Sequence, residues 1–254
     1  AGFQIAVFAF VGIELVGTTA AETRDPLKTL PKAINSIPLR IICFYVLALI
    51  VIMAVTPWNL IAPDRSPFVE MFILVGVGPA ASVVNFVVLT SAASSANSGV
   101  FSTSRMLFGL AERTASPKLF KILSHRSVPA NGLVFSCLCI LLAYILLSNI
   151  PSIIGAFTIV STISAILFIF VWGIILLSYI RYRKQRDHLH QQSTYEMPGG
   201  VAMCYVLLVF FAFVLTLLSL EEDTRQALIY TPIWFVILGI GYVFVKKNWE
   251  KLSD

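Results

Sequence analysis

The first residue of this chain with evident chemistry is Glu14, an acid inside the apolar stretch FAFVGIELVG. Gly12 lies two residues before it and Gly17 three residues after it. Glycine loosens a helix and lets backbone groups approach a ligand. An interrupted helix has two half-helix ends, whose N–H groups suit a carboxylate and whose C=O groups suit an ammonium. The spacing therefore predicts a broken helix with a site for an amino acid.

The residues around this break are the candidate site. An acidic side chain at the bilayer centre costs about 2.5–3.5 kcal/mol, so we expect Glu14 to have a role there. One role is gating or proton coupling, and the other is a buried acid that only holds the break in place. The candidate substrate-binding residues are Phe8, Ala9, Phe10, Val11, Gly12 and Ile13. Ala9 and Val11 leave limited room, which favours a small substrate with an uncharged side chain.

The composition places these residues in a membrane. Hydrophobic residues make up 58% of the 254 positions and charged residues 12%, so a soluble domain could not cover its apolar surface. A bilayer span needs roughly 20 apolar residues. The charge-free intervals are 41–63, 71–104, 127–180, 197–220 and 226–245. Because 127–180 is more than twice one span, we predict a turn at Ser148–Ser152. With the opening segment this predicts seven transmembrane helices and an all-α polytopic membrane protein.

The distribution of Lys and Arg predicts the orientation, because positive loops stay cytoplasmic. The loops 18–40, 105–130, 181–200 and 246–254 hold 16 of the 18 basic residues. The opposite loops, 58–70, 148–152 and 220–230, hold Arg65 and Arg225. We therefore expect the C-terminus in the cytoplasm, and the net charge of +5 indicates topology more than a nucleic-acid partner.

Several polar residues have both a structural and a functional interpretation. Asp25-Pro26 predicts a helix start with Asp25 as N-cap, and Pro31 and Pro38 are expected to prevent one long helix.

Within span 80–104, Ser91, Ser95 and Gly99 share one face. That face indicates either close helix packing or a hydrophilic wall of a transport path, for which Ser94 and Asn97 are the candidates. The hydroxyls of span 152–180 are expected to bond their own backbone.

The sequence indicates no metal, cofactor or enzyme chemistry. Cys137-x-Cys139 places its thiols on different helix faces and lacks a second ligand pair. His188 and His190 fall in a predicted solvated loop. No nucleophile–base set or phosphate-binding loop is evident, so we predict that the protein is not an enzyme.

Three motifs resemble a known family. They are FVGIE, then Glu22-x-x-x-Pro26 followed by Leu30-Pro31-x-Ala33-Ile34, and the segment from Asn85 to Ala111, NFVVLTSAASSANSGVFSTSRMLFGLA. Together they resemble the amino acid permeases of the amino acid-polyamine-organocation superfamily, and the likeness covers essentially the whole chain.

This resemblance implies a twelve-helix transporter of two inverted five-helix repeats, with broken first and sixth helices forming the site. The chain would begin in the sixth span. Residues 1–180 would be the second repeat, 181–200 a cytoplasmic loop, and 201–254 two peripheral helices (201–219 and 232–246) with a cytoplasmic tail. The missing N-terminal half would complete the site.

The implied activity is import of small neutral amino acids (glycine, alanine and serine, with tolerance of the D-forms) by proton symport across a bacterial inner membrane. Its partners would be the amino acid, the proton and membrane lipids. A permease for another amino acid and a seven-helix membrane receptor are the alternatives, because topology alone does not separate a receptor from a transporter.

Overall fold

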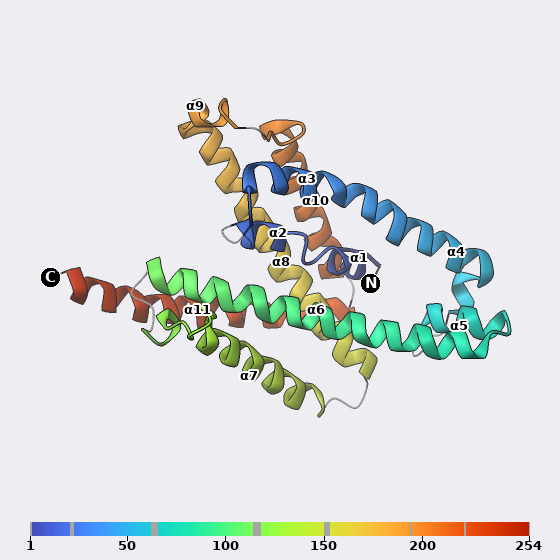
Figure 1. Ribbon diagram of the computed structural model, residues 1–254. Coiled ribbons are helices and arrows are strands. Elements are labelled where there is room, and N and C mark those ends of the chain that lie inside the picture. The colour runs from blue at the N-terminus through green and yellow to red at the C-terminus, as the bar shows by residue number, and fades with distance from the viewer. Residues whose placement is uncertain are drawn as a thin grey trace. The chain divides into compact units, whose positions relative to one another are not determined.

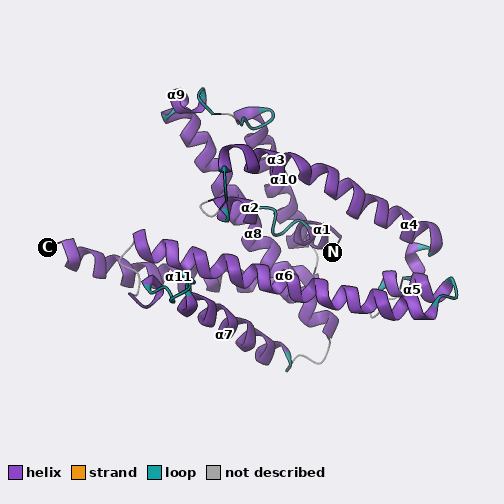
Figure 2. Ribbon diagram, viewed as in Figure 1, coloured by secondary structure: helices purple, strands orange, loops and turns teal. Residues whose placement is uncertain are grey.

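The computed structural model consists of α-helices joined by loops. It describes residues 2–20, 23–61, 66–113, 118–149, 153–193, 195–220 and 222–253, and no strand occurs within these ranges (Figure 2). The helix contacts divide the chain into two compact units: residues 1–13 with 147–254, and residues 14–146. We name them the α8 unit and the α6 unit, after the longest helix of each (Figure 1).

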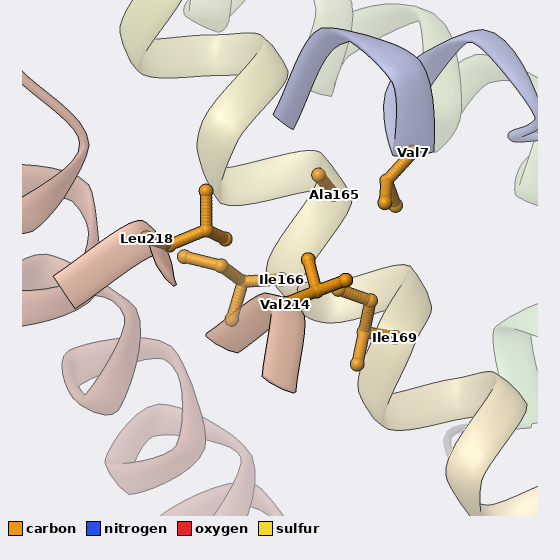
Figure 3. Close-up of a cluster of buried hydrophobic side chains, with 6 residues drawn as sticks. All are labelled: Val7, Ala165, Ile166, Ile169, Val214 and Leu218. Carbon is orange, nitrogen blue, oxygen red and sulfur yellow. The ribbon is translucent and has the colours of Figure 1, made fainter. Parts of the chain in front are cut away.

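The α8 unit is organised around one central helix. Its elements are α1 (Gly2–Ala9), α8 (Ile153–Gln185), α9 (Asp187–His190), α10 (Gly200–Leu220) and α11 (Glu222–Ser253). Helix α8 contacts all four of the others. Six buried side chains from α1, α8 and α10 form its core (Figure 3): Val7, Ala165, Ile166, Ile169, Val214 and Leu218. The core therefore attaches α1 to helices that lie far along the chain.

The α6 unit contains the remaining elements. They are α2 (Leu15–Thr18), α3 (Pro26–Ile41), the π-helical turn η2 (Ile42–Val46), α4 (Leu47–Val55), the 3-10 turn η3 (Trp58–Leu60), α5 (Pro67–Leu74), α6 (Gly78–Arg113), the 3-10 turn η4 (Lys118–Lys121) and α7 (Ala130–Leu147). Helix α5 packs on α6, and α2 contacts both α3 and α6. Helices α2 and α5 therefore both pack on the 36-residue helix α6.

Among the described residues, five helical segments are long and apolar enough to cross a bilayer. They are Pro26–Val55, Gly78–Glu112, Gly155–Gln185, Gly200–Leu220 and Thr224–Val243. The apolar helix Ala130–Ile145 is shorter, and the opening segment is divided into α1 and α2. Five of the seven predicted spans therefore coincide with segments of this kind, and α7 and the opening segment fall where the other two were predicted. The predicted fold-back falls between α7 and α8, although residues 150–152 lie outside the described part.

One prediction about the proline-rich connector was wrong. Pro31 and Pro38 do not end the helix, because α3, η2 and α4 form one continuous run over Pro26–Val55. Pro38 has no N–H and crowds the carbonyl of the residue four positions earlier. The π-helical turn begins four residues after Pro38. The turn therefore lies on the C-terminal side of Pro38, away from the carbonyl that the proline ring crowds.

One predicted helix cap and two helix boundaries also differ from the prediction. Asp25 does precede α3, but its backbone is left-handed (φ 49°) and its side chain makes no capping hydrogen bond. Helix α6 runs to Arg113 instead of ending near residue 104. Helix α11 begins at Glu222, inside the predicted loop 220–230. Polar residues in a helix that continues beyond the bilayer explain the last two differences.

Candidate functional site

The first span is interrupted between α1 and α2, at the position that the sequence predicted. The Phe10 N–H donates to the Val7 carbonyl at 3.1 Å, and the Val11 N–H donates to the Phe8 carbonyl at 3.1 Å. This three-residue spacing is that of a 3-10 turn. Gly12 then has a φ of 106°, which residues with a Cβ rarely adopt. The backbone itself therefore requires glycine at this position.

The six candidate substrate-binding residues form the end of α1 and the turn that follows it, all within the α8 unit. The ring of Phe8 is partly buried against the core and meets Phe157 of α8 edge-on, with 6.0 Å between centroids. Phe10, Val11 and Gly12 are half-buried, whereas Ala9 and Ile13 are exposed. Phe8 is thus fixed by packing, and the residues after it form the turn.

Glu14 begins the α6 unit as the N-cap residue of α2. Its backbone is helical (φ −69°, ψ −18°), and its carbonyl accepts the Gly17 N–H at 3.0 Å. Its side chain is half-buried and makes no capping hydrogen bond to α2. Capping of the helix that it begins is therefore not the role of this carboxylate.

Helix α2 contacts α6, and two hydroxyl groups approach each other there. The Thr18 hydroxyl donates to the Leu15 carbonyl at 2.8 Å and lies 3.5 Å from the Ser102 hydroxyl oxygen. Ser102 is buried. Ser94 and Asn97, the predicted wall residues, lie earlier on α6 and are both exposed. Ser102, and not the predicted wall residues, is thus the serine seen close to Thr18 of α2.

Gln4 is a buried polar residue that the sequence prediction missed. It is 1% exposed, and its side-chain amide donates to the Ser161 hydroxyl at 2.7 Å and to the Thr158 carbonyl at 3.4 Å. The Ser161 and Thr162 hydroxyls donate to the same carbonyl at 3.2 and 2.6 Å, as predicted for hydroxyls of this span. The missed signal was an amide in the apolar stretch GFQIAVFAF just before the break.

The described residues contain no group of three or more His, Cys, Asp or Glu side chains that could hold a metal ion. Contrary to the prediction of a solvated loop, His190 is buried, with 6.1 and 6.2 Å between its ring centroid and those of Tyr179 and Tyr182. Its Nε2 lies 3.9 Å from a Glu196 carboxylate oxygen. His190 therefore packs α9 against α8.

An all-helical chain with several membrane-spanning segments and an interrupted first span has the architecture of a helical membrane transporter. Its sequence matches the family model for amino acid permeases over residues 1–252. The chain belongs to the amino acid permease family, which confirms the resemblance of its motifs and removes the receptor alternative. Members of this family are multi-pass membrane transporters.

Three relatives show the degree of similarity. The chain is 68% identical to the D-serine/D-alanine/glycine transporter of Escherichia coli K12, over 98% of this chain and 53% of the relative. It is 51% identical to the amino-acid permease AapA of Bacillus subtilis (99% and 54%) and 41% identical to the DL-alanine permease SerP2 of Lactococcus lactis (96% and 53%). The chain spans about half the length of the curated relatives it matches. No solved structure matches it.

Proposed function

We propose that the complete permease containing this chain imports glycine, D-alanine and D-serine, with the L-forms of small neutral amino acids as further substrates, by proton symport. The observation that carries this proposal is the interruption of the first span at Gly12, together with 68% identity to a relative named for these three substrates. A chain that leaves the helical path presents amide and carbonyl groups in directions that a continuous helix cannot. These groups suit the carboxylate and ammonium that all amino acids share.

The selectivity for small substrates follows from the residues around the turn. Ala9 and Val11 are small, and Phe8 is held in place by Phe157. No basic residue lies in the opening segment before Glu14, so this half of the site offers no partner for an acidic side chain. In the proposal, Phe8 to Ile13 contact the substrate and Ser94 and Asn97 line the path.

The proposed architecture assigns residues 1–180 to the second five-helix repeat, 181–200 to a cytoplasmic loop, and 201–254 to two peripheral helices and a cytoplasmic tail. The positive loops support a cytoplasmic C-terminus in the bacterial inner membrane. Because the chain spans about half the length of its relatives, we propose that the first repeat supplies the other half of the site. We also propose that the permease catalyses no chemical conversion of its substrate.

Uptake by the complete permease tests this function. Right-side-out membrane vesicles are energised with a respiratory substrate and supplied with radiolabelled glycine. We expect accumulation above the external concentration, competition by D-alanine and D-serine, and weak competition by arginine or tryptophan. If arginine or tryptophan displaced glycine more effectively than D-alanine, a permease for another amino acid would replace this proposal.

A further inference from the structure

Gln4 is the largest fully buried side chain among the described residues. An amide at membrane depth is unfavourable unless its donors find acceptors. Gln4 finds both acceptors on α8, the Ser161 hydroxyl oxygen at 2.7 Å and the Thr158 carbonyl at 3.4 Å. Both of these hydrogen bonds therefore join Gln4 to helix α8.

Helix α1 needs such an attachment because it is short. It has eight residues, and isolated helices shorter than about 12–15 residues are marginal. The break at Gly12 also removes the support that a continuous helix would receive from α2. Apolar contacts of Val7 and Phe3 hold α1 on α8 and α10. Such contacts have little directional preference, and lipid tails compete for them.

The contacts of Gln4 and Phe8 fix α1 at two points. Residues four positions apart lie on the same face of a helix, and Gln4 and Phe8 both face α8. Gln4 bonds Thr158 and Ser161, whereas Phe8 meets the ring of Phe157. Two contacts one turn apart restrict both rotation of α1 about its axis and sliding along α8. The candidate substrate turn begins two residues after Phe8.

We infer that Gln4 is a positioning residue of the transporter, whose hydrogen bond to Ser161 holds the substrate-binding turn Phe10–Ile13 in place through α1. Gln4 itself does not touch the substrate in this inference. The geometry of this inference rests on contacts within the α8 unit. Its transport measurement rests on the proposed function.

The test uses the complete permease with Gln4→Met, Ser161→Ala and the double variant. Methionine keeps the length and the helix propensity of glutamine but removes its donors. Thr216→Val is the matched control, since the Thr216 hydroxyl is exposed and donates to the Ala212 carbonyl of its own helix. Two quantities are measured: KM and Vmax of glycine uptake per molecule in the membrane, and hydrogen–deuterium exchange of the purified protein.

We expect Gln4→Met to raise KM about 3- to 18-fold, the range that measured interhelical hydrogen bonds in membranes give. Vmax per molecule should change less than KM. Exchange of amides 8–13 should accelerate by a similar factor while α10 and α11 keep their rates. Ser161→Ala should act in the same direction, and the double variant should be no worse than the stronger single variant. Thr216→Val should match the unaltered protein.

Three results would overturn the inference. The first is unchanged hydrogen–deuterium exchange at residues 8–13 in Gln4→Met. The second is a double variant in which the effects of the two single variants on KM multiply. The third is uniformly faster exchange across the whole α8 unit, which indicates a merely structural residue. If the unaltered permease took up none of the three proposed substrates, the proposed function would fail instead. The exchange data would then still decide the role of Gln4.

Discussion

At the residue scale, the backbone geometry at Gly12 restricts which amino acid can occupy this position. Its φ of 106° is strained for any residue with a Cβ, and such strain costs about 1–3 kcal/mol. We therefore expect Gly12→Ala to shift the turn and to lower glycine uptake about tenfold or more. Rates are compared per molecule in the membrane.

Gly17→Ala is the control for this prediction. Nothing lies within 4 Å of the place where a Cβ on Gly17 would be, and Gly17 belongs to helix α2. Alanine favours a helix over glycine by about 1 kcal/mol, so Gly17→Ala should keep normal uptake. Equal uptake by the two variants would show that the break tolerates a side chain and that the positive φ has no bearing on transport.

Glu14 supports a second prediction at this scale. Its carboxylate is half-buried and does not cap α2, so a role in proton coupling remains our hypothesis. Glu14→Gln keeps shape and hydrogen bonding but removes titration. We expect this variant to fold, to bind glycine and to exchange it across the membrane, but to lose accumulation against a gradient. Counterflow and concentrative uptake, measured side by side, separate these activities.

Glu14→Ala provides the comparison. Loss of the whole side chain should also damage the break and reduce the amount of protein in the membrane. If Glu14→Gln concentrates glycine as well as the unaltered permease, Glu14 is structural. The proton would then be carried by a group outside this chain.

At the scale of elements, the contact between the start of α7 and the last turns of α6 depends on Gly132. A Cβ at this position would lie 3.0 Å from the carbonyl oxygen of Ser104, and Ser104 is buried. Helices in membranes commonly approach through small residues of this kind. A backbone carbonyl cannot rotate away as a side chain can, so Gly132→Ala should destabilise the protein by about 1–3 kcal/mol.

Thermal unfolding of the purified permease measures this effect. Gly109→Ala on α6 is the matched control, because nothing lies within 4 Å of the position that its added methyl group would occupy. We expect a lower Tm for Gly132→Ala and an unchanged or slightly higher Tm for Gly109→Ala. The same Tm for both variants would mean that α6 and α7 separate at little cost.

The sequence predicted the helical elements better than their ends. Apolar runs and the bilayer thickness predicted where the helices lie, and Gly12 predicted the break. The continuation of the helix past Pro31 and Pro38 was missed because the prediction relied on helix propensity, which the surrounding structure can override. Gln4 was missed for a different reason: its acceptors, Thr158 and Ser161, lie more than 150 positions away along the chain. Pairing over that separation needs the folded arrangement.

At the scale of the whole molecule, burial differs strongly between spans. The percentages refer to an apolar window of 18 residues within each span. In this window 6% of the residues are buried for Pro26–Val55, and 28% are buried for Gly155–Gln185. Apolar surface left open at membrane depth must meet lipid or further helices. We propose that the first repeat of the complete permease covers part of it, which agrees with a chain that spans about half the length of its relatives. Sequence composition predicts the apolar surface but not which neighbour covers it.

The last prediction concerns the ion that drives the complete permease. Sodium sites need several oxygen ligands, and Glu14 is the only carboxylate that the sequence places at membrane depth in this chain. One carboxylate suits a single proton better than a hard cation. We therefore expect glycine uptake into vesicles to follow an imposed pH gradient, acid outside, and to stop when a protonophore is added. Replacing sodium with choline should leave the initial rate within about twofold. Uptake that survives the protonophore and collapses without sodium would contradict proton symport and would place the cation ligands in the first repeat.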